Sequence, residues 1–186
     1  LHRPGLPQHC EECMRAKTKR RKKCCKKFNG SKDHFSYSKQ LTCDHVSFTT
    51  EGAAPGVDGY TDALTFMDRG SNFRLAQPTK SKDNAETLST LRFMKGADNW
   101  EILYSDCWNA FTNACLELEC AWQAAQPGVK HNNAIIENTN LQIVYDNKVA
   151  LSTAGLLACF WPFAVVYVCI LHNITKSYDC LLYTSP

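Results

Sequence analysis

The sequence predicts an α/β domain in which helices pack on a mixed β-sheet, with a basic arm in front of the domain. Three observations lead to this expectation. Short apolar runs with strand character come early, helical and strand patterns then alternate, and positive charge is concentrated near the N-terminus. Early strands followed by such alternation are typical of a mixed sheet covered by helices.

The charge of the chain divides at about residue 40. Residues 1–40 carry twelve Lys or Arg and three Asp or Glu, whereas the remaining 146 residues carry nine and fifteen. Basic arms bind polyanions, and nucleic acid is the commonest polyanion inside cells. A nuclear-import signal and a simply solvated arm are the alternative interpretations. The candidate phosphate contacts are Lys17, Lys19, Arg20, Arg21, Lys22 and Lys23.

Composition divides the chain into segments. We expect a basic arm at residues 1–28, a polar Gly- and Ser-containing linker at 29–42 and a folded core at 43–175. The last seven residues, 180–186 (CLLYTSP), match the translation of a transposase recognition end used as a sequencing adapter. We therefore exclude them from fold reasoning, with an ordinary frayed terminus as the alternative.

Cysteine usage favours a reducing, intracellular setting. The eleven cysteines are odd in number and scattered, they follow no signal peptide, and most lie in apolar surroundings. A reduced cysteine in such surroundings behaves as a small hydrophobe.

The first half of the core predicts strands at residues 44–50, 60–67 and 72–77, with a turn at 51–59. The second and third strands flank the polar residues 68–71, so they predict a hairpin. A helix is expected at 78–97, because apolar residues such as Leu88 and Leu91 recur at threes and fours behind a polar start.

The second half predicts a buried strand at 100–104, a short helix at 108–118, a short strand at 120–125 and a long helix from 133 to about 154. The following segment, residues 156–171, is apolar and uncharged, and its length does not exclude a membrane span. Because Trp161 and Pro162 interrupt it, we expect a buried or partner-facing helix and no membrane association.

Two acidic residues have positions suited to metal chemistry. Asp106 follows an apolar strand, and Glu137 lies near the start of the long helix. If that helix returns against the strand end, the two carboxylates meet at one sheet edge, where hard divalent cations bind through oxygen. Phosphoryl transfer on DNA uses two such cations. Taken alone, both residues could equally be surface carboxylates.

Several blocks, in order, resemble the integrase core of copia-type long-terminal-repeat retrotransposons. The blocks are residues 44–46 (DHV, with Cys43 in place of the family's Gly), 62–69 (DALTFMDR) with 78–82 (PTKSK), 104–106 (YSD, followed by Cys107 in place of Asn), 127–137 (PGVKHNNAIIE, followed by Asn138 in place of Arg) and 154–164 (AGLLACFWPFA, with Leu157 in place of Pro).

The resemblance implies a ribonuclease-H-like fold and a polynucleotidyl transferase that trims the element DNA ends and joins them to target DNA. It implies Mg²⁺ or Mn²⁺ held by Asp106 and Glu137, a homo-oligomer, and action in the nucleus. Lys130 and His131 are further candidate DNA contacts by position. The family's first carboxylate would fall on Thr49, which predicts impaired activity, with Glu51 as a partial substitute.

Cys10 and Cys13 resemble the end of the family's His-His-Cys-Cys zinc module, and such paired cysteines suit tetrahedral zinc. His2 and His9 have the wrong spacing, so half a site remains and weak or no Zn²⁺ binding is expected. Two alternatives stay open: a non-catalytic nucleic-acid-binding remnant, and the translation of a decayed pseudogene.

Overall fold

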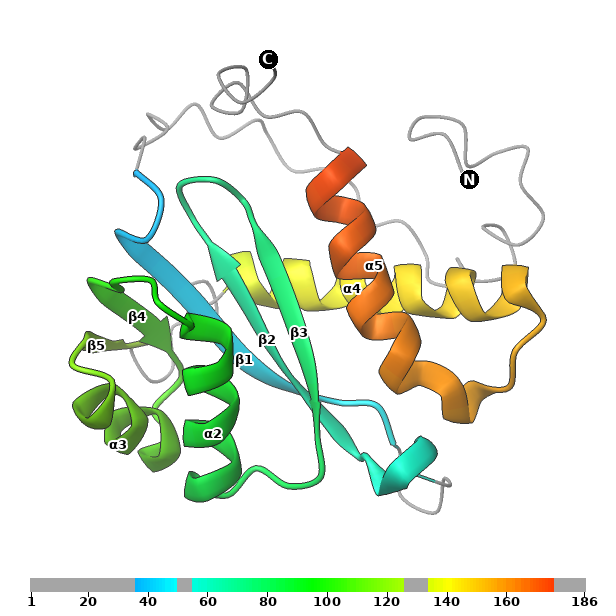
Figure 1. The fold of residues 1–186 in the computed structure, drawn as a ribbon, viewed down its shortest axis with the longest axis horizontal. Helices are drawn as coiled ribbons and strands as arrows, with labels where there is room; N and C mark the ends of the chain where they lie inside the picture. Colours follow the sequence, from blue (N-terminus) through cyan, green and yellow to red (C-terminus); the bar gives the residue numbers. More distant parts are fainter. Residues whose placement is uncertain (1–35, 50–54, 126–133, 176–186) are drawn as a thin grey trace.

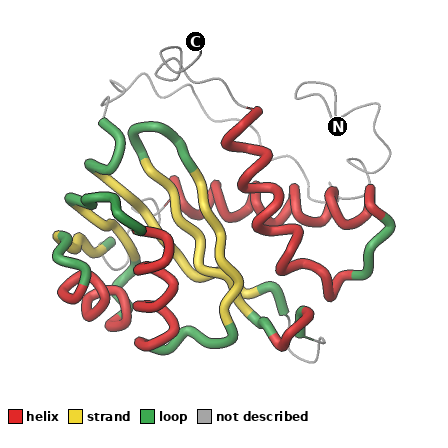
Figure 2. The backbone as a smooth tube through the Cα atoms, viewed as in Figure 1, coloured by secondary structure: helices red, strands yellow, loops and turns green. Residues whose placement is uncertain are grey.

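Five strands form one mixed sheet in the order β3-β2-β1-β4-β5. Strands β1 (Gln40–Ser47), β2 (Asp62–Asp68) and β3 (Arg74–Thr79) pair antiparallel, and β4 (Ile102–Ser105) and β5 (Ala121–Ala124) extend the sheet parallel to β1. The structure is a computed structural model that describes residues 36–49, 55–125 and 134–175. The predicted mixed α/β architecture is confirmed (Figure 2).

Helices cover both faces of this sheet (Figure 1). Helices α2 (Asn84–Lys95) and α3 (Asn109–Glu117) pack on one face, and α4 (Ala134–Ala154) and α5 (Trp161–Thr175) pack on the other. Two short 3₁₀ helices, η2 (Val57–Gly59) and η3 (Ala158–Phe160), join these elements.

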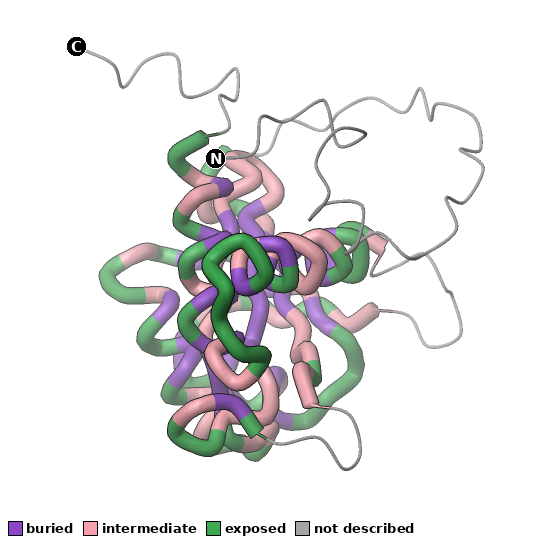
Figure 3. The backbone as a smooth tube through the Cα atoms, turned by 90° about the vertical axis from the view of Figure 1, so that its right-hand side faces the viewer, coloured by how far each residue is buried: buried purple, intermediate pink, exposed green. Residues whose placement is uncertain are grey.

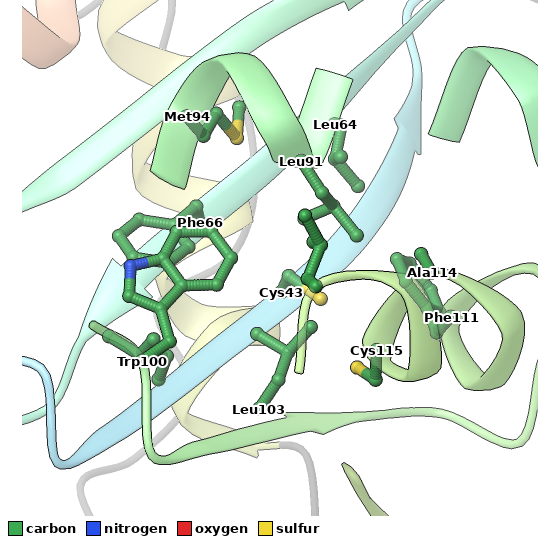
Figure 4. Close-up of a cluster of buried hydrophobic side chains, with 12 residues drawn as sticks. Cys43, Leu64, Phe66, Leu91, Met94, Trp100, Leu103, Phe111, Ala114 and Cys115 are labelled. Carbon is green, nitrogen blue, oxygen red and sulfur yellow. The ribbon is translucent and has the colours of Figure 1, made fainter. Parts of the chain in front are cut away.

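The core between the sheet and α2 and α3 is closely packed. Cys43 of β1 and Leu103 of β4 lie beneath Leu91 of α2 and Phe111 of α3 (Figure 4). At one end, the rings of Phe66 and Trp100 stack with centroids 4.9 Å apart. Burial of these side chains is the main stabilising contribution to this layer.

The two strands of the predicted hairpin are confirmed, but the predicted helix start at residue 78 is wrong. Pro78 lies in β3 and is paired with Ala63. Helix α2 begins six residues later, where the Asp83 carboxylate accepts a hydrogen bond of 2.8 Å from the backbone N–H of Glu86. Proline is tolerated in β3 because this strand is at the edge of the sheet.

Strand β1 also begins earlier than predicted. Its first residue is Gln40, so residues 40–42, which composition assigns to the linker, belong to the sheet. The later elements begin and end within a few residues of their expected positions.

Helix α5 is docked on the edge strand β3. The Asn173 side chain accepts a hydrogen bond from the backbone N–H of Arg74 (2.9 Å) and donates one to its carbonyl (2.7 Å). Pro162 lies in the first turn of α5 and does not interrupt the helix, because N–H groups of a first turn have no helical partner.

One face of α5 is apolar and exposed. Phe163, Tyr167, Ile170 and Ile174 are each at least half exposed and recur at helical spacing. Buried and exposed stretches alternate along the helices (Figure 3). The described residues contain one segment, Ala158–Thr175, that is long enough and apolar enough to cross a membrane. A core helix can satisfy the same criterion, and about 39% of this segment is buried.

Candidate active site

Asp44 is a partly buried carboxylate in the central strand β1. Its Oδ2 atom accepts a hydrogen bond of 2.9 Å from Nδ2 of Asn140 on α4. The Oδ1 atom of Asn140 in turn lies 2.6 Å from the Thr65 hydroxyl of β2, which also lies 3.0 Å from the backbone carbonyl of Asp44. Strand and helix are thereby fixed to each other at this carboxylate.

Asp106 lies beside Asp44 at the edge of the sheet where β4 ends. The parallel register pairs Thr42 with Tyr104, and two residues further along each strand come Asp44 and Asp106. The Asp106 side chain is exposed, whereas its backbone carbonyl accepts hydrogen bonds from the Trp108 N–H (2.9 Å) and the Ser105 hydroxyl (3.0 Å). The turn that carries this carboxylate is therefore held by local hydrogen bonds.

Glu137 reaches the same region from α4. It is exposed in the first turn of the helix and lies three residues before Asn140. Residues three apart share one face of a helix, so the hydrogen bond from Asn140 to Asp44 positions Glu137 near the same carboxylate. Asp106 and Glu137, which the sequence pairs, are thus both neighbours of a third acid.

The electrostatics of Asp44 reflect this crowding. Burial, followed by the negative charges of Asp106 and Glu137, raises the pKa of Asp44 from 3.8 to about 6, against the opposing effects of the His45 backbone N–H and the Lys82 ammonium. Burial also raises the pKa of Asp106, and Lys82 opposes this shift as well. Acids that repel each other in this way favour a bound cation.

Within the described part of the chain, the charge of Lys82 lowers the pKa values of both Asp44 and Asp106. Its Nζ atom lies 3.2 Å from Oδ1 of Asp62 and 2.9 Å from the Ser47 hydroxyl. Because Asp62 offsets much of its charge, Lys82 neutralises Asp44 and Asp106 only in part.

Asp44, Asp106 and Glu137 are of the right residue type to bind a divalent cation. Their side chains do not, however, point at one common position. Three carboxylates supply the all-oxygen ligand set that Mg²⁺ and Mn²⁺ prefer. However, no three His, Cys, Asp or Glu side chains within residues 36–49, 55–125 and 134–175 lie close enough together to hold an ion. Asp106 and Glu137 are both exposed, so rotamer changes in these two side chains would be enough to bring them closer to Asp44.

Thr49, to which the resemblance assigns the family's first carboxylate, lies outside the acid cluster. Thr49 lies beyond the end of β1 and donates a hydrogen bond of 3.3 Å to the carbonyl of Thr61. Thr49 follows Asp44 by five residues, a separation of about 16 Å if the chain is extended. The acid that is level with Asp106 is Asp44, which the motif comparison names but places outside the site.

Sequence reasoning also missed Asn140 and Lys82. Asn140 lies one helical turn after Glu137, a spacing that is visible in the sequence, but its partner on β1 is ninety-six residues away. The other predicted site residues lie outside the described residues. They are Glu51, Lys130 and His131, the cysteines Cys10 and Cys13, and the arm residues Lys17, Lys19, Arg20, Arg21, Lys22 and Lys23.

Comparisons with known proteins bear on the fold. No protein-family model matches the chain, and neither does any curated protein. Among solved structures, the chain is similar to one chain of the cryo-EM structure of the simian T-cell lymphotropic virus intasome in complex with PP2A regulatory subunit B56 gamma, with a TM-score of 0.61 and 15% sequence identity. The match covers 80% of this chain and 55% of that chain, so this chain spans about half the length of its structural relative. At this identity the likeness is one of fold: a mixed sheet with flanking helices.

Proposed function

We propose that this chain is the catalytic core of a DNA integrase, a metal-dependent polynucleotidyl transferase with a ribonuclease-H-like fold. The observation that carries the proposal is that Asp44, Asp106 and Glu137, from β1, β4 and α4, lie near one another at one edge of the sheet. The ordered sequence motifs and the fold likeness to a chain of a retroviral intasome structure support it.

The proposed cation ligands are the three carboxylates, with Asn140 orienting Asp44. Mg²⁺ or Mn²⁺ bound there would activate the attacking oxygen and stabilise the leaving oxygen of a phosphodiester. In trimming, water attacks the phosphorus and the bond to the 3′ oxygen breaks. In joining, the 3′-hydroxyl of the element end attacks a phosphodiester of the target, and the target 3′ oxygen leaves.

The geometry changes the expected activity of this chain. The prediction of impairment depended on Thr49 as the position of the missing acid. With Asp44 as the first carboxylate the ligand set has three acids, so we propose that the core is competent for catalysis. The homo-oligomer and the DNA partners remain part of this proposal.

An oligonucleotide assay for cleavage and joining, run with Mg²⁺ or Mn²⁺, tests the proposal. Asp44→Asn, Asp106→Asn and Glu137→Gln should each reduce the product by at least a hundredfold. Asp58→Asn is a matched control, because Asp58 is exposed in η2, away from the cluster. Wild-type product that is insensitive to all three active-site substitutions would refute the proposal.

A second candidate function is DNA binding without catalysis, through the basic arm. The observation that favours it is the density of nine Lys or Arg among the fourteen residues 14–27. Such binding should weaken steeply with salt, because cations released from the DNA phosphates drive it. DNA binding unchanged by Asp106→Ala, together with no joining activity, would favour this alternative.

A further inference from the structure

An open pocket of about 660 Å³ lies next to Asp106. Two short segments line it: residues 82–85, which lead into α2, and residues 107–109, which lead into α3. Its volume is within the range of pockets that bind small organic groups. Because Cys107 follows Asp106 directly in the chain, whatever occupies this pocket lies close to the carboxylate cluster.

Trp108 forms one wall of the pocket and is 49% exposed. The other three tryptophans of the chain are more covered: Trp100 and Trp161 are buried, and Trp122 is half-buried and donates to the Ser105 hydroxyl. The backbone of Trp108 is fixed on both sides, since its N–H donates to Asp106 and its carbonyl accepts from Phe111. The backbone of Trp108 is therefore held close to Asp106, and its exposed indole offers a stacking surface there.

The charges around the pocket favour a neutral occupant. Lys82 carries the positive charge, but it is paired with Asp62. Asp83 adds a negative charge to the wall, with its carboxylate engaged by the Glu86 N–H and the Ser81 hydroxyl. These charges largely cancel, which suits a planar uncharged ring better than a phosphate. Asn84 and Asn109 add exposed amide groups able to bond the edge of such a ring.

We infer that this pocket holds one unpaired nucleobase of the DNA substrate, stacked on Trp108, next to the phosphodiester that reacts at the carboxylates. The inference deepens the proposed function and rests on it for the position of the reacting phosphate. Stacking on an aromatic side chain tolerates any base, so the pocket distinguishes DNA sites by how easily a base leaves the stack and not by their sequence. A mismatched or single-stranded position is the preferred substrate, because extruding its base costs least.

The test measures tryptophan fluorescence of the full chain titrated with a short single-stranded DNA, a duplex containing one mismatch, and the fully paired duplex. The titration is run at about 0.3 M salt, where the basic arm contributes least. We expect quenching and tighter binding for the first two DNAs. Trp108→Leu should remove most of the quenching and weaken their binding about tenfold, whereas Trp108→Phe should retain most of the affinity.

Phe93→Leu is the matched control, because Phe93 is an exposed aromatic residue of α2 (74% exposed) that does not line the pocket. Circular dichroism and thermal melting of Trp108→Leu should match wild type, since the ring is exposed. Equal affinity of wild type and Trp108→Leu for the mismatched duplex would overturn the inference.

A parallel joining assay separates failure of the inference from failure of the proposed function. Joining that keeps its wild-type level and its preference for distorted target sites in Trp108→Leu would overturn the pocket and leave the integrase proposal intact. Quenching that depends on Trp108, without joining by wild type, would refute the integrase proposal and retain the nucleobase site.

Discussion

Asn140 of α4 donates a hydrogen bond of 2.9 Å to the carboxylate of Asp44 on β1, across ninety-six residues of sequence. This contact brings the helix that carries Glu137 against the strand that carries Asp44. It therefore links the stability of the α4 layer to the arrangement of the candidate active site.

Asn140→Ala should lower both stability and catalysis. Hydrogen bonds to charged groups contribute roughly 1.5–3 kcal/mol, so the free energy of unfolding measured with urea should fall by about 2 kcal/mol. Joining activity should fall at least tenfold, because Glu137 loses its alignment. Asn138→Ala, at an exposed position of the same helix, is the control. Equal effects of the two substitutions would argue against the anchoring role.

Asp44→Asn should change how stability depends on pH in metal-free protein. Burial and the neighbouring acids raise the pKa of Asp44 from 3.8 to about 6, so between these values the folded state binds more protons than the unfolded state. The free energy of unfolding of wild type should therefore fall as pH rises from 4 to 6 and then level off. Asp44→Asn removes that loss, which is on the order of 3 kcal/mol at pH 7.5. Parallel curves for both proteins, from urea unfolding in EDTA, would contradict the assignment.

Divalent cations should stabilise the folded chain at neutral pH. At a hundredfold excess over the dissociation constant, Mg²⁺ or Mn²⁺ should add about 2.7 kcal/mol. The gain should shrink at pH 5, where Asp44 holds a proton, and should be largely lost in Glu137→Gln. Differential scanning calorimetry against NaCl of matched ionic strength measures it. A gain of the same size in both proteins would place the cation elsewhere.

Thr49→Asp should give no increase in joining activity. Thr49 bonds to Thr61 beyond the end of β1, about five residues from the acid cluster, so a carboxylate there cannot replace Asp44. The informative comparison is the double variant Asp44→Asn with Thr49→Asp, which should stay as inactive as Asp44→Asn alone. Rescue in the double variant would restore Thr49 as the site of the first carboxylate.

The cysteines of the described region should differ in alkylation rate. Burial raises the pKa of the Cys43 and Cys169 thiols, whereas a hydrogen bond from Cys115 lowers the pKa of Cys120. Exposed Cys107 and half-buried Cys120 should therefore react with iodoacetamide well before Cys43 and Cys169 under native conditions. Peptide mapping by mass spectrometry resolves each site, and equal labelling of all four in folded protein would exclude this packing.

Local sequence patterns were enough to predict the hairpin and the long helix, because each depends on residues close together in the chain. Asp106 and Glu137 became site candidates only through the resemblance of ordered motifs, and their role stays a prediction. The position of Asp44 depends on the parallel pairing of β1 with β4, which no local pattern encodes. Pro78 misled the helix prediction for a related reason. Proline is equally compatible with a helix start and with an edge strand, and only the sheet order decides between them.

The contact between Asn173 and Arg74 has a further consequence for how copies of this chain meet. The backbone N–H and carbonyl of Arg74 both bond to Asn173, so they point away from β2. Pro78 lies four residues further along β3, and its backbone therefore has the same orientation as that of Arg74. The hydrogen-bonding groups of Arg74 are occupied by Asn173, and Pro78 has no backbone N–H to offer. A further strand added at β3 would therefore lose ladder bonds at two outward positions, which protects this border from sheet-to-sheet aggregation. A sheet continued through β3 is therefore an unfavourable way for copies of the chain to assemble.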